Sequence, residues 1–483
     1  MHRPSEQALG PSLLRLVTSG MYDDPLALYR EYLQNAADSA AETQKPGRVE
    51  IHLDPQLAHI RIRDYGPGLT SKEAIDSLIP VGQSTKNAAS HRGFRGIGRL
   101  AGLPFAEAVA FTTRADNDEP PVRVTWDALR LRSDERSGKE LRVSDCVTVE
   151  RLQADDVPGQ YFEVEVRGVA RYAAGSVLNR RRVHDYIAES CPVPLSTDFP
   201  FREQVEEHLG DVLYAMEVSV DGEGTVSRLH AGGVEFAGGR TDTFKAVETF
   251  DLPRIDSSER AAAGWIAHTS YLGAIPKGSG IRGIRARCGN IQVGGERVFD
   301  HLFKEDRLNR WTVGEVHILD PRILPNGRRD YFEPGPHLRN LENHLGAIFR
   351  RLAERCRTTS ATRTRERRFA EAIADSEEAY ALARSGYVTA EAARHLIEQD
   401  LDRLARVRAA LCSTEDWDPD LLARLETVES KLTRFQARRG RPRLKNVKPE
   451  DVATYRSVFR AIAESTESRR AAREIIEKVL ERT

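Results

Sequence analysis

The sequence predicts an α+β protein in which two regions of mixed helices and strands precede an all-helical region. Three observations lead to this prediction. A helical pattern over residues 25–40 runs into two alternating strand patterns, helices and strands mix again between residues 183 and 319, and beyond residue 350 glycine gives way to arginine, alanine and glutamate. We therefore expect three domains, at residues 1–170, 171–350 and 351–483.

The first helix is expected to start at Asp24, a good N-cap residue, with Pro25 in the first helical position. Apolar residues recur with the helical period and predict its packed face, which holds Leu26, Tyr29, Leu33, Ala36, Ala37 and Ala40. Three polar residues lie opposite, namely Glu31, Asn35 and Asp38. Taken alone, they indicate a solvated helix face rather than a site.

A strand hairpin is expected next, because apolar residues alternate on both sides of Asp54 and Pro55. Its second strand runs into Asp64 and a Gly-Pro-Gly turn made by Gly66 and Gly68. Such glycines allow positive φ and a close approach of the backbone to a ligand. A carboxylate at a strand end can accept a hydrogen bond from an adenine amine, although a plain turn would use the same residues.

A second glycine cluster, Gly93, Gly96 and Gly98, precedes an apolar helical start. Free backbone amides at such a position favour a phosphate. Residues 96–101 also fit the dinucleotide fingerprint, but a polar stretch precedes them where a buried strand is required, so we reject that interpretation. The sequence contains no Gly-x-x-x-x-Gly-Lys-Ser/Thr motif, which excludes a P-loop ATPase.

In this order and spacing, the three motifs resemble those of the GHKL ATPase superfamily. Its members include heat-shock-protein-90 chaperones, type II topoisomerases, MutL and MORC proteins, and histidine kinases. The resemblance extends to about residue 350. It implies a Bergerat-type ATP-binding α/β sandwich, a second α/β middle domain of the transducer kind, and ATP with Mg²⁺ as cofactors.

By this resemblance, Glu31 is the general base that activates water and Asn35 ligates Mg²⁺. The two residues lie one helical turn apart and so point into the same space. Asp64 would accept a hydrogen bond from the adenine amine, in a pocket shaped by Gly66 and Gly68. The other implied nucleotide contacts lie in or after an ATP lid at residues 82–95, and they are Lys86, Gly93, Arg95, Gly96, Ile97 and Gly98.

The chain departs from the family at the last strand of the ATPase domain. Where a Gly-Thr pair commonly occurs, this sequence has Gly159 and Gln160. The missing nucleotide contact could come from Thr112 or Thr113. Asp38 lies one turn beyond Asn35, either as part of the pocket or as a supporting acid on the helix face.

In the second domain, residues 323–332 read Ile-Leu-Pro-Asn-Gly-Arg-Arg-Asp-Tyr-Phe. This segment is similar to the one in the heat-shock-protein-90 middle domain whose arginine reaches the terminal phosphate of ATP. We assign that role to Arg328 or Arg329, with a preference for Arg329 because it precedes the acid. An arginine there would stabilise charge on the transferred phosphoryl group. The alternative is a surface arginine pair within a network of acids.

The helical region could be a dimerisation module, a partner-binding arm, or helices packed on the middle domain. Between two of its helices lies a basic segment containing Arg439, Arg441 and Arg443. Its Arg-Gly-Arg-Pro core matches an AT-hook, which inserts into the minor groove of A·T-rich DNA. A basic interhelical loop is the alternative explanation.

Global composition indicates a cytoplasmic protein. The net charge of −1 argues against coating by nucleic acid, five scattered cysteines predict neither a disulfide framework nor a zinc site, and no apolar run reaches membrane-spanning length. Two functions remain. One is a slow Mg²⁺-dependent ATPase that drives conformational change in a chaperone-like homodimer with an unknown client. The other is a DNA-associated ATPase of the MutL or MORC kind, in repair or defence against foreign DNA.

Overall fold

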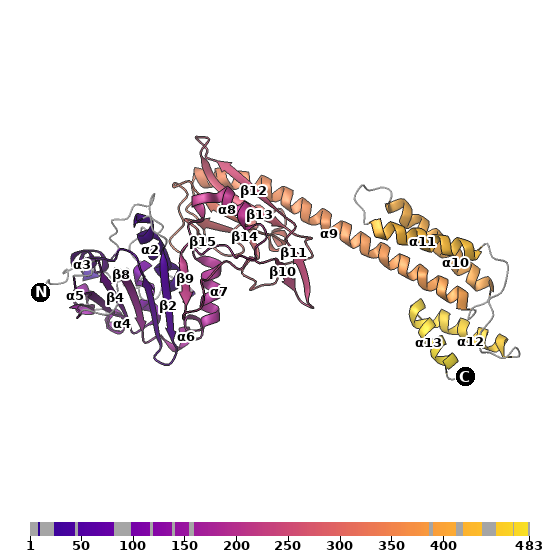
Figure 1. Ribbon diagram of the computed structural model, residues 1–483, viewed down its shortest axis with the longest axis horizontal. Coiled ribbons are helices and arrows are strands. Elements are labelled where there is room, and N and C mark those ends of the chain that lie inside the picture. Colours follow the sequence, from indigo (N-terminus) through magenta and orange to yellow (C-terminus); the bar gives the residue numbers. More distant parts are fainter. Residues whose placement is uncertain are drawn as a thin grey trace. The chain divides into compact units, whose positions relative to one another are not determined.

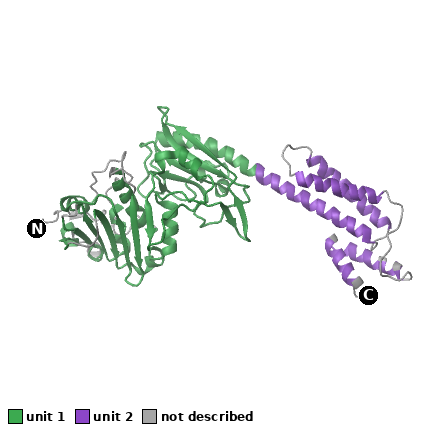
Figure 2. Ribbon diagram, viewed as in Figure 1, with its two compact units in different colours: residues 1–357 green, residues 358–483 purple. Residues whose placement is uncertain are grey.

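The computed structural model describes residues 8–9, 24–43, 47–81, 98–115, 119–137, 141–153, 159–385, 390–411, 419–436, 451–466 and 468–481. The chain divides into two compact units, Met1–Arg357 and Thr358–Thr483, within the long helix α9 (Pro336–Ser385) (Figure 2). The predicted mixture of helices and strands with a helical C-terminal region is confirmed. Within the described residues, no helix is long and apolar enough to cross a membrane.

Seven strands of the first unit form one sheet in the order β7-β5-β4-β8-β3-β2-β9 (Figure 1). In chain order, these are β2 (Arg48–Asp54), β3 (His59–Asp64), β4 (Ala108–Arg114), β5 (Val122–Asp127), β7 (Val147–Arg151), β8 (Tyr161–Arg167) and β9 (Glu217–Val220). Neighbouring strands are antiparallel, except that β9 pairs in parallel with β2. The predicted hairpin is therefore β2 and β3.

One face of this sheet carries the first hydrophobic core, because alternate strand residues are apolar. Among the helices that contribute to this core are α2 (Ala27–Thr43), α3 (Ser71–Leu78), α6 (Arg171–Val177) and α7 (Arg180–Ser190). On the opposite face lie ion pairs such as Arg63 with Glu163, whose nearest N and O atoms are 2.6 Å apart. The core continues to Val226, past the boundary predicted at residue 170, and that boundary stays a prediction.

Shorter elements complete this region. They are β1 (Ala8–Leu9), paired with β6 (Leu141–Arg142), the helices α4 (Ala128–Ser137) and α5 (Val143–Cys146), and the 3₁₀ turns η2 (Gly98–Leu100) and η3 (Leu103–Phe105).

A second sheet has the strand order β12-β13-β16-β14-β15. Its strands are β12 (Ala246–Pro253), β13 (Arg260–His268), β14 (Gly283–Cys288), β15 (Ile291–Val293) and β16 (Val313–Ile318). Residues of β13 alternate between two cores, so that Ile266 packs with the first part of α9 and Trp265 packs with α8 (Arg202–Leu209). Helices therefore cover both faces. Beside this sheet lie η4 (Gly210–Leu213), η5 (Asp300–Leu302), η6 (Asp306–Trp311), and a hairpin of β10 (Gly233–Phe236) and β11 (Arg240–Thr243).

The second unit is helical. It contains the remainder of α9 and four further helices, α10 (Ala390–Leu411), α11 (Pro419–Gln436), α12 (Val452–Ser465) and α13 (Arg469–Glu481). Apolar residues of α10 lie in its core, including Ile397, Leu404 and Leu411. The predicted basic residues Arg439, Arg441 and Arg443 lie outside the described residues.

The first helix starts two residues later than predicted. Asp24 Oδ1 accepts a hydrogen bond from the Leu26 amide at 2.9 Å, so its side chain does cap the turn. However, the amides of Ala27, Leu28 and Tyr29 donate to carbonyls three residues earlier. This tighter 3₁₀ pattern makes residues 24–26 a turn, and the α-helix begins at Ala27.

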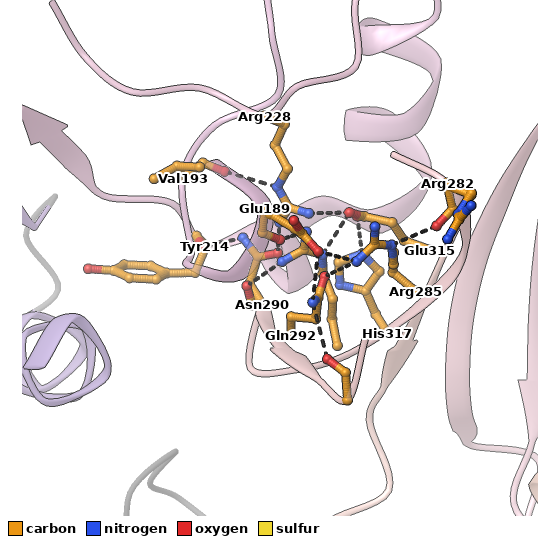
Figure 3. Close-up of polar contacts among 12 residues, drawn as sticks. Glu189, Val193, Tyr214, Arg228, Arg282, Arg285, Asn290, Gln292, Glu315 and His317 are labelled. Atoms are coloured by element: carbon orange, nitrogen blue, oxygen red, sulfur yellow. Dashed lines mark hydrogen bonds and ion pairs between the residues drawn. The ribbon is translucent and has the colours of Figure 1, made fainter. Parts of the chain in front are cut away.

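A buried charged cluster lies where α7 meets the second sheet (Figure 3). Glu315 on β16 is fully buried and pairs with both Arg228 and Arg287. Burial alone would raise the pKa of Glu315, but the charges of Arg228 and Arg287 outweigh it and hold this pKa well below its usual range. Arg287 also donates to the backbone oxygen of Glu189 on α7, at 2.8 Å. The cluster therefore ties the helix to the sheet.

We predict that Glu315→Gln destabilises the protein by about 3 to 5 kcal/mol, because it leaves two buried guanidinium groups without an anion. Chemical denaturation of the full chain would measure the loss. The matched control is Glu259→Gln, which removes an exposed partner of Arg254 and should cost at most about 1 kcal/mol. Equal, small losses in both variants would contradict the role given to the cluster.

Candidate functional site

The acidic face of α2 is buried. Glu31 is 5% exposed and Asp38 is 2% exposed, while Asn35 between them is partly exposed. The alternative of a solvated acidic face therefore does not hold for the two acids. Since burying carboxylates is costly without partners, their surroundings indicate what they do.

Two groups lie against the Glu31 carboxylate from the first sheet's own region. The neighbouring Arg30 donates from Nη2 to Glu31 Oε1 at 3.3 Å. Gly98, at the start of η2, comes so close that a Cβ added there would collide with Oε2 of Glu31. Any side chain at this position would have to displace the end of the Glu31 side chain. Gly98 is thus beside the predicted base.

Arg329 reaches Glu31 from the second sheet's region. Its Nε lies 4.0 Å from Glu31 Oε1, and its side chain is only 10% exposed. Arg328 is exposed. Of the two arginines proposed from the sequence, Arg329 is therefore the one beside Glu31.

The backbone at Arg329 is unusual, with φ of +58° in a residue other than glycine. Such a conformation costs free energy and is found where the surroundings enforce it, often at functional sites. Here the Arg329 amide donates to the Asn326 carbonyl at 3.1 Å, and the Gly294 amide donates to the Arg329 carbonyl at 2.7 Å. The turn is therefore held on both sides of the strained residue.

Asp64 lies at the end of β3 on the core face of the first sheet. Burial raises the pKa of its carboxyl to about 7, and one hydrogen bond from the Gly66 amide, at 3.0 Å, lowers it only in part. Gly68 has φ of +65°, and a Cβ there would collide with the carbonyl oxygen of Arg114. The predicted turn thus brings the backbone against the sheet beside a carboxyl that readily gains or loses a proton near pH 7.

Thr112 and Thr113 point to opposite faces of the sheet. The Thr112 hydroxyl accepts a hydrogen bond from Arg123 at 2.9 Å, on the face away from Asp64. Thr113 pairs across β8 in register with Asp64, and its hydroxyl accepts from the Leu69 amide at 2.8 Å. Because side chains alternate along a strand, only Thr113 is on the face of the predicted pocket. We therefore replace Thr112 by Thr113 as the candidate nucleotide contact.

Several predicted contacts cannot be placed, because they lie outside the described residues: Lys86, Gly93, Arg95, Gly96 and Ile97. Gly159 has φ of +84°, and its carbonyl accepts two hydrogen bonds from Arg114.

Tyr32 was not among the residues predicted from the sequence. Its hydroxyl accepts a hydrogen bond from the Gly102 amide at 3.0 Å and so holds the segment that follows Gly98. A tyrosine on a helix packed against a glycine-rich segment was the available signal.

The residues present fit a nucleotide with Mg²⁺. Asn35 offers an oxygen ligand one turn from Glu31, and a single protein ligand can anchor Mg²⁺ when phosphates and water supply the rest. Asp64 offers a hydrogen-bond acceptor, and Gly66 leaves room beside it, since a Cβ there would lie 2.8 Å from Asp64 Oδ1. The arginine at Glu31 adds the positive charge that a terminal phosphate requires.

Part of the chain is similar to bacterial chaperones. It is 30% identical over 135 residues to the chaperone protein HtpG of Acinetobacter baylyi, a match that covers 23% of this chain and 21% of that protein. It is 26% identical over 147 residues to the HtpG of Polaromonas naphthalenivorans, covering 25% and 23%. The chain thus spans less than a quarter of the length of either relative. No family model matches it.

We predict that ATP binds about tenfold more weakly at pH 6 than at pH 8, since a pKa near 7 leaves Asp64 mostly ionised at pH 8 and mostly protonated at pH 6. The ionised carboxylate is the better acceptor for the adenine amine, so binding at low pH must first remove the proton. Calorimetric titration with Mg²⁺ would measure the affinity. Asp64→Asn controls for titration of the phosphates themselves, and an equal pH slope in parent and variant would contradict the assignment.

Proposed function

We propose that this protein binds ATP with Mg²⁺ and hydrolyses it slowly to ADP and phosphate. The observation that carries the proposal is the approach of Arg329 Nε to within 4.0 Å of Glu31 Oε1. Glu31, an acid that can serve as a base, is on α2 beside the first sheet. Arg329, which can neutralise phosphate charge, is in a turn beside the second sheet. Neither sheet's own packing requires them to meet, so function is the better explanation of the contact.

Glu31 is the proposed general base. Its carboxylate would take a proton from the attacking water, and Arg30 at 3.3 Å would keep the carboxylate oriented. Gly98 has no Cβ to displace Oε2 of Glu31, so the carboxylate keeps its place beside the η2 turn. Bound Mg²⁺ would neutralise charge on the phosphates, and Asn35 would hold it.

Arg329 is the proposed phosphate arginine. A guanidinium group is always protonated and presents several donors in one plane, which suits the oxygens of a phosphoryl group. Its positive charge would stabilise the charge that develops there during hydrolysis. Asp64 and Thr113 would bind the adenine side, with Gly66 and Gly68 shaping that end of the pocket. Asp38 stays a proposed supporting acid.

The wider role proposed is that of a cytoplasmic, chaperone-like homodimer whose client is unknown. The two similar proteins are named chaperones, which supports this choice. Closure of Arg329 on a bound phosphate would link the state of the nucleotide to the relation between the two sheets. Nothing in the described residues favours the DNA-associated alternative, because the basic segment on which it depended lies outside them.

Steady-state ATP turnover with Mg²⁺ tests this function. We predict that Glu31→Ala lowers turnover about a hundredfold or more, the usual contribution of a general base, while ATP still binds. Asp76→Asn, on the exposed face of α3, is the control and should turn over ATP like the parent. Equal turnover in all three proteins would show that Glu31 is not the base, and an absence of turnover in the parent would overturn the proposed hydrolysis.

A further inference from the structure

Gly294 lies directly beneath the turn that carries Arg329. Its amide donates to the Arg329 carbonyl at 2.7 Å, immediately after strand β15 ends. It has φ of +67°, and a Cβ added to it would lie 2.7 Å from the carbonyl oxygen of Asp330. Any other residue would therefore push against the backbone of the arginine turn and would also have to adopt a left-handed conformation.

A chain of hydrogen bonds leads from Gly294 to helix α7. Gln292 Nε2 donates to the Gly294 carbonyl at 3.1 Å and also lies 3.5 Å from Glu189 Oε1 on α7. Arg285 joins the same group, because it pairs with Glu189 and donates to Gln292 Oε1 at 3.2 Å (Figure 3). Gln292 and Arg285 are 5% and 3% exposed. A buried polar group that loses its hydrogen-bond partner destabilises the protein. The hydrogen bonds of Gln292 and Arg285 therefore hold this arrangement in place.

Helix α7 also supports the other half of the site. It packs against both α2 and β15. Glu31 is on α2, and Gly294 follows β15. One helix is thus in contact with the element that carries the proposed base and with the element that holds the proposed phosphate arginine.

We propose that Gly294 is a positioning residue for Arg329, and that Gln292 and Glu189 fix Gly294 relative to the helix that supports Glu31. This inference rests on the proposed function for its catalytic consequence. According to this proposal, β15 and α7 set the distance between Glu31 and Arg329, and the turn that carries Arg329 does not set it alone. Gly294 itself touches no substrate and acts through Arg329.

The test compares Gly294→Ala with Gly295→Ala in the full chain. Gly295 is the matched control, because a Cβ there meets nothing within 4 Å. The first measurement needs no nucleotide and follows hydrogen–deuterium exchange of the amides in residues 326–331. Among them, the amides of Asn326, Arg329 and Asp330 donate within the turn, for example Asn326 to the Tyr331 carbonyl at 2.9 Å. We expect faster exchange there in Gly294→Ala and parent-like exchange in Gly295→Ala.

The second measurement is ATP turnover. A misplacement of about 1 Å can cost about a hundredfold in rate, so Gly294→Ala should lower kcat by about that factor with little change in KM. In an Arg329→Ala background, Gly294→Ala should cause no further loss, which separates loss of positioning from loss of folding. Gln292→Leu, which removes the donor to the Gly294 carbonyl without adding a Cβ at Gly294, should give smaller shifts in the same direction.

The outcomes separate this inference from the function on which it rests. Parent-like exchange of the turn in Gly294→Ala would overturn the inference. So would faster exchange with an unchanged kcat, or an equal loss of kcat in the presence and absence of Arg329. A parent that binds ATP but shows no turnover dependent on Glu31 would overturn the proposed function, and the exchange comparison would still decide whether Gly294 holds the turn.

Discussion

The buried carboxylate of Glu315 organises the junction on which the candidate site depends. It is shared by Arg228 and Arg287, and Arg287 also holds the backbone of α7 through the Glu189 carbonyl. Two guanidinium groups and one carboxylate in a dry interior are tolerable only when their geometry is fixed, because each unpaired charge would cost several kcal/mol. The ends of α7 and β14 are therefore constrained relative to each other, and β15 follows β14 directly.

This constraint explains how a strained arginine can be kept in place. Arg329 has a left-handed backbone conformation, which the turn alone would not favour. The Gly294 amide and the close packing of Gly294 against Asp330 hold that conformation from one side. From the other side, the carboxylate of Glu31 attracts the guanidinium group. The rigid junction of α7 with the second sheet and the negative charge of Glu31 thus both hold Arg329 in place.

The sequence was informative wherever a local pattern decides the structure. The alternation around Asp54 predicted the hairpin of β2 and β3, and the glycines after Asp64 predicted a turn with positive φ, which Gly68 has. The start of α2 was wrong by two residues, because the competition between 3₁₀ and α hydrogen bonds in the first turn leaves no clear mark in the sequence.

Features that depend on contacts between residues far apart along the chain could not be predicted from the sequence. Whether Thr112 or Thr113 points to the pocket face of the sheet follows from the register of β4 with β8 and not from the residue type. The preference for Arg329 over Arg328 came from a resemblance, and its exposure and distance to Glu31 arise only from tertiary packing. Helix α7 contacts α2 and β15, each more than a hundred residues away along the chain, and Gly294 contacts Arg329 from 35 residues earlier. No local pattern could reveal this support.

ATP turnover of Arg329→Ala, compared with Arg328→Ala, tests most directly whether an arginine from a turn beside the second sheet completes the proposed site. These neighbours have the same side chain and differ in exposure, so each controls for the loss of one positive charge from the turn. We predict that Arg329→Ala lowers turnover about a thousandfold, the lower end for a phosphate arginine, while ATP affinity changes much less and Arg328→Ala stays close to the parent. Equal turnover in the two variants, or a larger loss in Arg328→Ala, would contradict it.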